Sequence, residues 1–289
     1  MRTMTWFLDL RASSVGGVTS SEVVLRQGAG RCTDLRGFLE QVQGRDVLLG
    51  THGFNVNRLD GVASLSKWES LLTLGPNAVF IGILWPGDSR WMPVLDYPFE
   101  DQEAITSALL LAPFLNRYFN EAASLSFVSH SLGARMVLET IKRIDPNLNV
   151  IQAILMAGAI NDDCLSQEYK KKVTTRLKDV SVLASLSDRV LEVAFPLGNP
   201  LAGIITQGHP YWRGALGRYG PQRPRPDNLD SAWQIPGAWG YGHGNYLGGD
   251  PPKRLPPITL PGISTDVPAS KPGWSAGFVS THFRNTLDR

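Results

Sequence analysis

One serine of this chain lies in surroundings that would expose and activate its hydroxyl group. Ser131 is the middle residue of the motif Ser-His-Ser-Leu-Gly (residues 129–133), which follows the apolar run 125–128 and precedes a segment with helical periodicity. A sharp strand-to-helix turn presents a serine hydroxyl and directs the free N–H groups of the helix at the atom it attacks. Small residues must flank the turn, and Ser129 and Gly133 are small. The pattern predicts a nucleophile elbow, the alternative being a serine-rich turn without chemistry.

A serine nucleophile needs a histidine base and a carboxylate that orients the histidine, because its hydroxyl is weakly reactive at neutral pH. In doubly wound hydrolases these residues follow in the order serine, acid, histidine. Three histidines come after Ser131, namely His209, His243 and His282. We expect the base to be His243, in the glycine- and tyrosine-containing segment 241–247, with His282 and His209 as alternatives.

The candidate acids follow predicted strands. Asp188 comes just after the predicted strand 180–184, at the edge of a parallel sheet where catalytic groups gather. Asp162 and Asp163 follow the preceding strand and are an alternative. Asp188 could also serve only as the N-cap of a short helix that starts at Arg189, and the two roles are compatible.

An acyl-transfer site also needs two N–H donors for the oxyanion of the tetrahedral intermediate. We expect one from Leu132, directly after the nucleophile, and one from Phe54 in the motif Thr-His-Gly-Phe-Asn (residues 51–55). His130, within the elbow, is expected to point away from the base, and Trp85 could equally be a core residue. The residues that we expect to bind substrate are His52, Gly53, Trp85 and His130.

The segments around these residues alternate between strand-like and helix-like patterns. Strands are predicted at residues 5–10, 23–26, 46–50, 78–85, 125–128, 150–157 and 180–184. Helices are predicted at residues 62–72, 100–119 with a kink or break at Pro113, 134–144 and 164–177. This alternation predicts an α/β fold with a doubly wound, mostly parallel sheet that is covered by helices on both faces.

The last third of the chain differs in composition, because residues 196–289 hold 14 of the 20 prolines and half of the tryptophans. We expect residues 1–195 to form the core and residues 196–289 a loop-rich extension of the same domain that carries the base. A loop-formed cover is expected within residues 197–239. The aromatic residues that could line an acyl pocket there, or anchor the extension, are Tyr211, Trp212, Trp233 and Trp239.

The overall composition narrows the class of protein. The chain has 289 residues and a formal net charge of +2, which is too small to indicate a nucleic-acid partner or an anionic membrane surface. It has no apolar run of about 18 residues for a membrane span and no pattern of a signal peptide. Cys32 and Cys164 lack the spacing of a metal site. We expect a cytoplasmic protein without integral membrane association and without a cofactor, and its oligomeric state is open.

Together these motifs resemble the α/β-hydrolase superfamily, and within it the bacterial DUF900-like hydrolases of unknown function. The resemblance covers roughly residues 47–247 and implies a triad of Ser131, Asp188 and His243 with no cofactor. Many members have a helix directly after the histidine, but residues 248–261 are too rich in glycine and proline for one. The matching residues are His52-Gly53-Phe54-Asn55, Trp85-Pro86-Gly87-Asp88, Ser129-His130-Ser131-Leu132-Gly133 with Arg135 and Leu138, Ser187-Asp188, and His243-Gly244-Asn245-Tyr246.

The expected function is that of a serine hydrolase that cleaves a carboxylic ester or related acyl bond in a small-molecule substrate, through an acyl-enzyme on Ser131. Two alternatives stay open. One is a binding or scaffold protein that has the hydrolase fold without activity, and the other is an acyltransferase that uses the same triad. The fold hosts many activities, so no particular substrate is implied.

Overall fold

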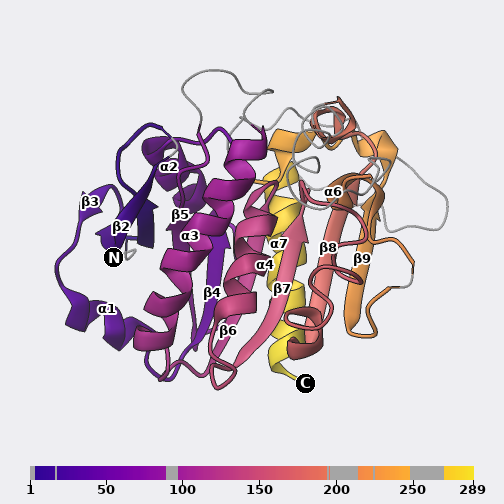
Figure 1. Ribbon diagram of the computed structural model, residues 1–289. Helices are drawn as coiled ribbons and strands as arrows, with labels where there is room; N and C mark the ends of the chain where they lie inside the picture. The colour runs from indigo at the N-terminus through magenta and orange to yellow at the C-terminus, as the bar shows by residue number, and fades with distance from the viewer. Residues whose placement is uncertain are drawn as a thin grey trace.

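The computed structural model describes residues 4–16, 18–88, 97–193, 195, 214–223, 225–247 and 270–289. Within these residues nine strands form one sheet in the order β3-β2-β1-β5-β4-β6-β7-β8-β9 (Figure 1). The strands are β1 (Trp6–Arg11), β2 (Thr19–Gln27), β3 (Gly30–Arg31), β4 (Asp46–Thr51), β5 (Ala78–Leu84), β6 (Ser124–His130), β7 (Val150–Met156), β8 (Asp179–Ser185) and β9 (Leu229–Ile235).

The helices cover both faces of this sheet, with α3 and α4 on one face and α7 on the other (Figure 1). The α-helices are α1 (Leu35–Val42), α2 (Arg58–Glu69), α3 (Tyr97–Tyr118), α4 (Gly133–Arg143), α6 (Leu216–Tyr219) and α7 (Lys271–Leu287). Three short 3-10 turns are η1 (Thr174–Arg176), η2 (Gly237–Trp239) and η3 (His243–Asn245). Among the described residues, no helix combines the length and the apolar character that crossing a membrane requires.

The sheet is parallel from β1 through to β9, and only β2 and β3 at one edge run antiparallel to their neighbours. The predicted doubly wound, mostly parallel α/β fold is therefore confirmed. Every residue of β6, β7 and β8 is buried, because helices cover both faces of a parallel sheet. The polar residues in β6 and β8 are mostly serines, which are small enough to be buried there. The predicted helix 100–119 is α3, which continues across Pro113.

The parallel arrangement places the carboxyl ends of the central strands side by side, at the same end of the strands. Thr51 at the end of β4 is aligned with Ser129 of β6, and Ser129 with Leu155 of β7. The loops that follow these strands therefore meet at the same edge, where open parallel sheets bind their ligands.

Residues 164–177 do not form the predicted α-helix. They form irregular turns that end in η1, because several amides bond five residues back, as Tyr169 does to Cys164 and Thr174 does to Tyr169. The Thr174 hydroxyl also donates to the Leu165 carbonyl.

The C-terminal extension contains more regular structure than we expected. Strand β9 pairs in parallel with β8, and Pro226 and Pro236 lie outside it. Helix α7 starts with Ser270 as its N-cap and has Pro272 in its first turn, where proline is tolerated. Its buried face consists of Ser275, Ala276, Val279, Ser280, Phe283 and Thr286.

The aromatic residues of the extension that the structure describes act as anchors. Trp239 is buried, and its ring contacts that of Trp274 of α7 at 5.3 Å between centroids. Trp233 is exposed, although its ring contacts that of Trp274 at 6.3 Å between centroids. Residues 197–213, most of the first half of the expected cover with Tyr211, Trp212 and the alternative base His209, lie outside the described residues.

A glycine where α6 meets the end of β7 allows a testable change. A Cβ at Gly217 would lie 2.0 Å from the carbonyl carbon of Ala157, so Gly217→Ala should lower the free energy of unfolding by about 1–3 kcal/mol or more. Gly277→Ala in α7 is the matched control, because no atom lies within 4 Å of its added Cβ, and it should be neutral or stabilising by up to about 1 kcal/mol. Denaturant unfolding followed by circular dichroism measures both. Equal midpoints for the two variants would contradict the close packing.

Candidate active site

The backbone at Ser131 forms the expected turn between β6 and α4 in a strained conformation. Its φ angle is 55°, in the left-handed region that residues other than glycine rarely adopt. Its N–H donates to the Met156 carbonyl at 3.0 Å, and its carbonyl accepts from the Ala159 N–H at 3.1 Å. The loop after β7 thus holds the strained residue on both sides, as such strain requires.

Two glycines let the loop after β4 touch this turn. A Cβ at Gly133 would lie 2.5 Å from the His52 carbonyl oxygen, and a Cβ at Gly53 would lie 2.7 Å from the Ser131 Cβ. Ser129, at the position where glycine is usual, is fully buried. Glycine is therefore needed at residues 53 and 133, because a larger residue would collide with the facing segment.

The structure brings Ser131, His243 and Asp188 together. His243 Nε2 lies 2.7 Å from Ser131 Oγ, and His243 Nδ1 lies 2.7 Å from Asp188 Oδ2. An ionised carboxylate only accepts hydrogen bonds, so Nδ1 carries the ring proton and Nε2 offers its lone pair to the serine hydroxyl. In this arrangement the imidazole can take a proton from the serine.

The Asp188 carboxylate is fully buried and uses both oxygens. Its Oδ1 accepts from the Leu191 N–H at 3.0 Å, so the predicted N-cap role coexists with the contact to His243. Arg218 braces this loop by donating to the carbonyls of Leu186 at 2.6 Å and Asp188 at 2.8 Å. The sequence analysis missed Arg218, which carries no motif of its own.

The alternative residues lie elsewhere. The His282 carbonyl accepts from Gln152, near the start of β7 and so at the opposite edge of the sheet from Ser131. The Asp162 carboxylate accepts from Gln222, and His243 contacts Asp188 instead.

Strand β8 and helix α7 hold the loop that carries His243. The Ser185 hydroxyl at the end of β8 donates to the Tyr241 carbonyl at 2.7 Å. The Ser275 hydroxyl of α7 donates to the Tyr246 carbonyl at 2.6 Å. No helix was expected directly after His243, and in the structure α7, which starts at Lys271, fixes this loop.

The expectation that His130 points away from the base is wrong. Its Nε2 donates to the His243 carbonyl at 2.7 Å, and the two rings lie 4.9 Å apart between centroids. The loop that carries His243 passes over the end of β6, so it contacts both His130 and Ser131.

Burial keeps two histidines beside Ser131 uncharged. The pKa of His130 is lowered to about 3, mainly by burial and in smaller part by the positive charge that His243 can carry. Burial likewise lowers the pKa of His52 to about 4. His52 Nδ1 donates to the Gly53 carbonyl at 2.8 Å, and its Nε2 has no partner among the described residues.

Three of the residues that we expected to bind substrate are buried behind the loop. His52 and Trp85 have no exposed surface, and Gly53 is buried. Trp85 Nε1 donates to the His52 carbonyl at 3.0 Å, and the two rings stack with centroids 6.0 Å apart. The side chains of His52 and Trp85 therefore support the loop after β4, and a role of these residues in substrate binding stays a prediction.

Two backbone amides at the carboxyl ends of these strands have no acceptor in the part of the chain that the structure describes. Neither the Phe54 N–H nor the Leu132 N–H has an acceptor among the described residues. Leu132 is the N-cap of α4, where unpaired N–H groups favour negative charge. As far as the described ranges show, both amides are available to a ligand.

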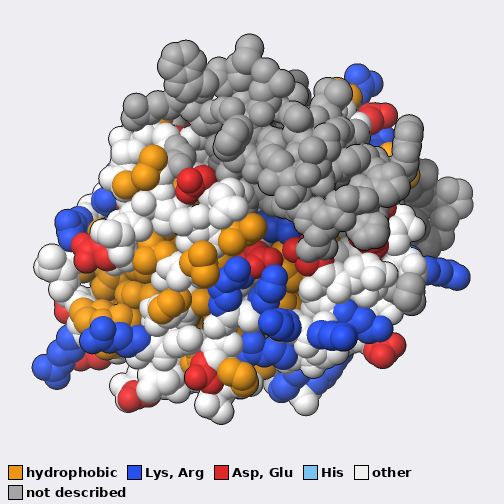
Figure 2. Space-filling model, viewed as in Figure 1, with side chains coloured by type: hydrophobic (Ala, Val, Ile, Leu, Met, Phe, Trp, Pro, Cys, Tyr) orange, Lys and Arg blue, Asp and Glu red, His pale blue; other side chains and the backbone are white. Residues whose placement is uncertain are grey.

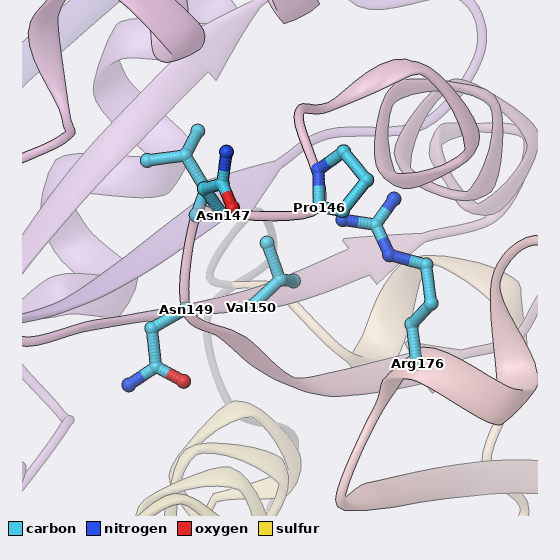
Figure 3. Close-up of a pocket in the computed structure, with 6 residues that line it drawn as sticks. Pro146, Asn147, Asn149, Val150 and Arg176 are labelled. Carbon is cyan, nitrogen blue, oxygen red and sulfur yellow. The ribbon is translucent and has the colours of Figure 1, made fainter.

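Other features of the surface do not compete with this site. A hollow beside the start of β7 is lined by residues 146–150 and Arg176 (Figure 3), but Arg176 already donates to the carbonyls of residues 141, 144 and 145. Basic side chains gather over α4 (Figure 2). Within α4, Lys142 and Arg143 pair with Glu139. Within the described ranges, no cluster of three or more His, Cys, Asp or Glu residues could hold a metal ion.

The neutral buried histidines predict how stability depends on pH. In the unfolded chain both histidines take up a proton below about pH 6.5. In the folded protein they do so only near pH 4 for His52 and pH 3 for His130. The free energy of unfolding should therefore decrease as the pH falls below 6.5. Each histidine should contribute a loss of up to about 2 kcal/mol between pH 7 and pH 5. Denaturant unfolding at the two pH values should show a smaller loss in His130→Gln than in the wild type. An equal loss would argue against a neutral His130.

The chain is similar to several solved structures at low sequence identity. The chain resembles the crystal structure of esterase PE8, at 14% identity and a TM-score of 0.44 over 85% of this chain and 94% of that one. It resembles an esterase from Thermogutta terrifontis at 11% identity and a TM-score of 0.38, covering 86% and 83%. It resembles MenH from S. aureus at 12% identity and a TM-score of 0.39, covering 86% and 95%. At these TM-scores the likenesses carry no argument about activity.

No curated protein matches the chain in sequence. One family model does, and its description is an alpha/beta hydrolase of unknown function (DUF900). The match spans residues 29–207, which include Ser131 and Asp188 but not His243. More than half of the chain is matched, so this protein belongs to the DUF900 family of α/β hydrolases.

Proposed function

We propose that this protein is a serine hydrolase that cleaves a carboxylic ester or a related acyl bond in a small molecule. The observation that carries the proposal is the pair of 2.7 Å contacts that His243 makes with Ser131 Oγ and Asp188 Oδ2. A serine is activated when its hydroxyl is hydrogen-bonded to a base and that base is hydrogen-bonded to an orienting acid.

The first half of the proposed reaction forms an acyl-enzyme. Ser131 Oγ attacks the carbonyl carbon while His243 Nε2 takes its proton. Asp188 holds the tautomer of the ring and stabilises the imidazolium. The amides of Phe54 and Leu132 bind the oxyanion. The tetrahedral intermediate then collapses, and the leaving alcohol departs with the proton from His243.

The second half releases the acyl group to water. His243 takes a proton from the water, whose oxygen attacks the ester carbonyl on Ser131. The same amides bind the second oxyanion, and Ser131 leaves with the proton that His243 returns. No cofactor is needed for either half. An acyltransferase would differ only in that another acceptor replaces water.

Labelling by a fluorophosphonate tests the nucleophile. Ser131 should displace fluoride and keep one phosphonyl group, which intact mass and peptide mapping would detect. Ser131→Ala should take none, and the buried Ser129→Ala is the matched control that should label like the wild type. Folded wild-type protein that takes no label would instead support a binding protein without activity.

Substitutions of the acid and the base test the rest of the triad on a panel of short- to long-chain esters. Asp188→Asn should lower kcat by about 10³–10⁴-fold, because the ring loses its tautomer and its charge partner, and His243→Ala should be at least as damaging. The controls Asp162→Asn and His282→Ala should retain activity. If Asp162→Asn lost activity while Asp188→Asn kept it, the acid would be Asp162. If His282→Ala lost activity while His243→Ala kept it, the base would be His282.

A further inference from the structure

One buried arginine joins three loops beside the proposed site. Arg11 is the last residue of β1 and is 2% exposed. Its Nη1 donates to the carbonyls of Val56 at 3.0 Å and Trp85 at 2.9 Å. Its Nε and Nη2 donate to carbonyls within residues 13–16 at 3.3–3.4 Å. The guanidinium thus links the β1–β2 connection to the loops that follow β4 and β5.

The charge of this arginine is balanced by one buried carboxylate. Asp88 is 4% exposed, and its Oδ1 accepts from Arg11 Nη2. Its Oδ2 accepts from the Gly16 N–H at 3.0 Å. Both oxygens and all three guanidinium nitrogens are therefore bonded. A buried pair of this kind gives little net stability, but the loss of one partner leaves an uncompensated charge.

The arginine acts on the segment that carries the Phe54 amide. Directly after Phe54, Asn55 has a φ angle of 58°, and its N–H donates to the Gly87 carbonyl at 2.5 Å. The next carbonyl, that of Val56, accepts from Arg11. Gly87 lies next to Asp88 in the chain. The bond from Asn55 to Gly87 and the bond from Arg11 to Val56 therefore both connect the loop after β4 to the Arg11–Asp88 ion pair.

We propose that the Arg11–Asp88 ion pair positions the Phe54 N–H for the oxyanion. The inference rests on the proposed function, and it makes both residues positioning residues, because neither touches Ser131, His243 or Asp188. Donors must be fixed before the oxyanion forms, and small displacements of a reacting group cost large factors in rate. Arg11 donates hydrogen bonds to carbonyls that lie in several directions. The five N–H groups of a guanidinium can reach all of them, but the single ammonium group of lysine cannot.

Two variants, Asp88→Asn and Arg11→Lys, test this role through hydrogen exchange and kinetics. Exchange of the amides in residues 53–57 should rise at least about tenfold, since their carbonyl anchors are lost. The kcat for an ester should fall about 10–100-fold with KM within about threefold of the wild type, because oxyanion contacts form only in the transition state. An arylboronic acid, whose tetrahedral adduct places an oxygen in the oxyanion site, should bind more weakly by a similar factor.

A second buried ion pair provides the control. Glu139 of α4 pairs with Lys142 and Arg143 away from the site, so Glu139→Gln should lower the melting temperature without changing exchange in residues 53–57, kcat or boronate binding. The acid limb of the pH–rate profile should be that of the wild type in all variants, because the triad is untouched.

The outcomes separate the two proposals. Unchanged exchange in residues 53–57, or unchanged kcat in Asp88→Asn and Arg11→Lys, would overturn the inference and leave the hydrolase intact. An equal loss of kcat in Glu139→Gln would also overturn it, because general destabilisation would then explain the effect. A wild type that neither labels at Ser131 nor cleaves esters would overturn the proposed function, and the exchange data alone would then decide whether the pair holds the loop.

Discussion

The direct contact between the loop after β4 and the turn after β6 is the constraint on which the site depends. The His52 carbonyl lies against Gly133, and Gly53 lies against the side chains of Ser131 and His130. A contact this close fixes the relative position of the nucleophile and of the neighbouring amides within a small tolerance. Each backbone must then be held from its other side as well. The loop after β7 holds the turn at Ser131, and the buried arginine at the end of β1 holds the loop after β4.

The electrostatics of this edge follow from how little water reaches it. His52 and His130 are buried and neutral, so neither places a second positive charge beside the imidazolium that the proposed reaction forms on His243. The carboxylate that stabilises this imidazolium is itself buried, where its attraction is less screened. His130 binds the backbone of His243 and so takes part in the site as a neutral hydrogen-bond donor.

The sequence predicted the parts of this molecule whose signals are local. The apolar run before Ser131 and the helical pattern after it predict the turn, because burial on both faces leaves a continuous apolar strand. Helix α7 was missed because the extension as a whole is rich in glycine and proline, and this composition hid the helical segment at its end. Arg11 was missed for another reason. Its carboxylate partner lies 77 residues away along the chain, and no spacing within one segment indicates such a pair. The contact of His130 with His243 likewise joins residues 113 positions apart.

Because α7 anchors the His243 loop, the active site can lose its geometry under milder conditions than those that unfold the whole protein. The sheet from β4 to β8 is a continuous buried core, whereas the loop is held by a few hydrogen bonds to β8, to His130 and to α7, such as the bond from Ser275 to Tyr246. Proteins open locally in cooperative units whose free energies are lower than that of global unfolding. If α7 detaches as such a unit, the histidine loses its place while Ser131 stays on its intact turn. Inactivation would then be an early and reversible event, in which the nucleophile persists without its base.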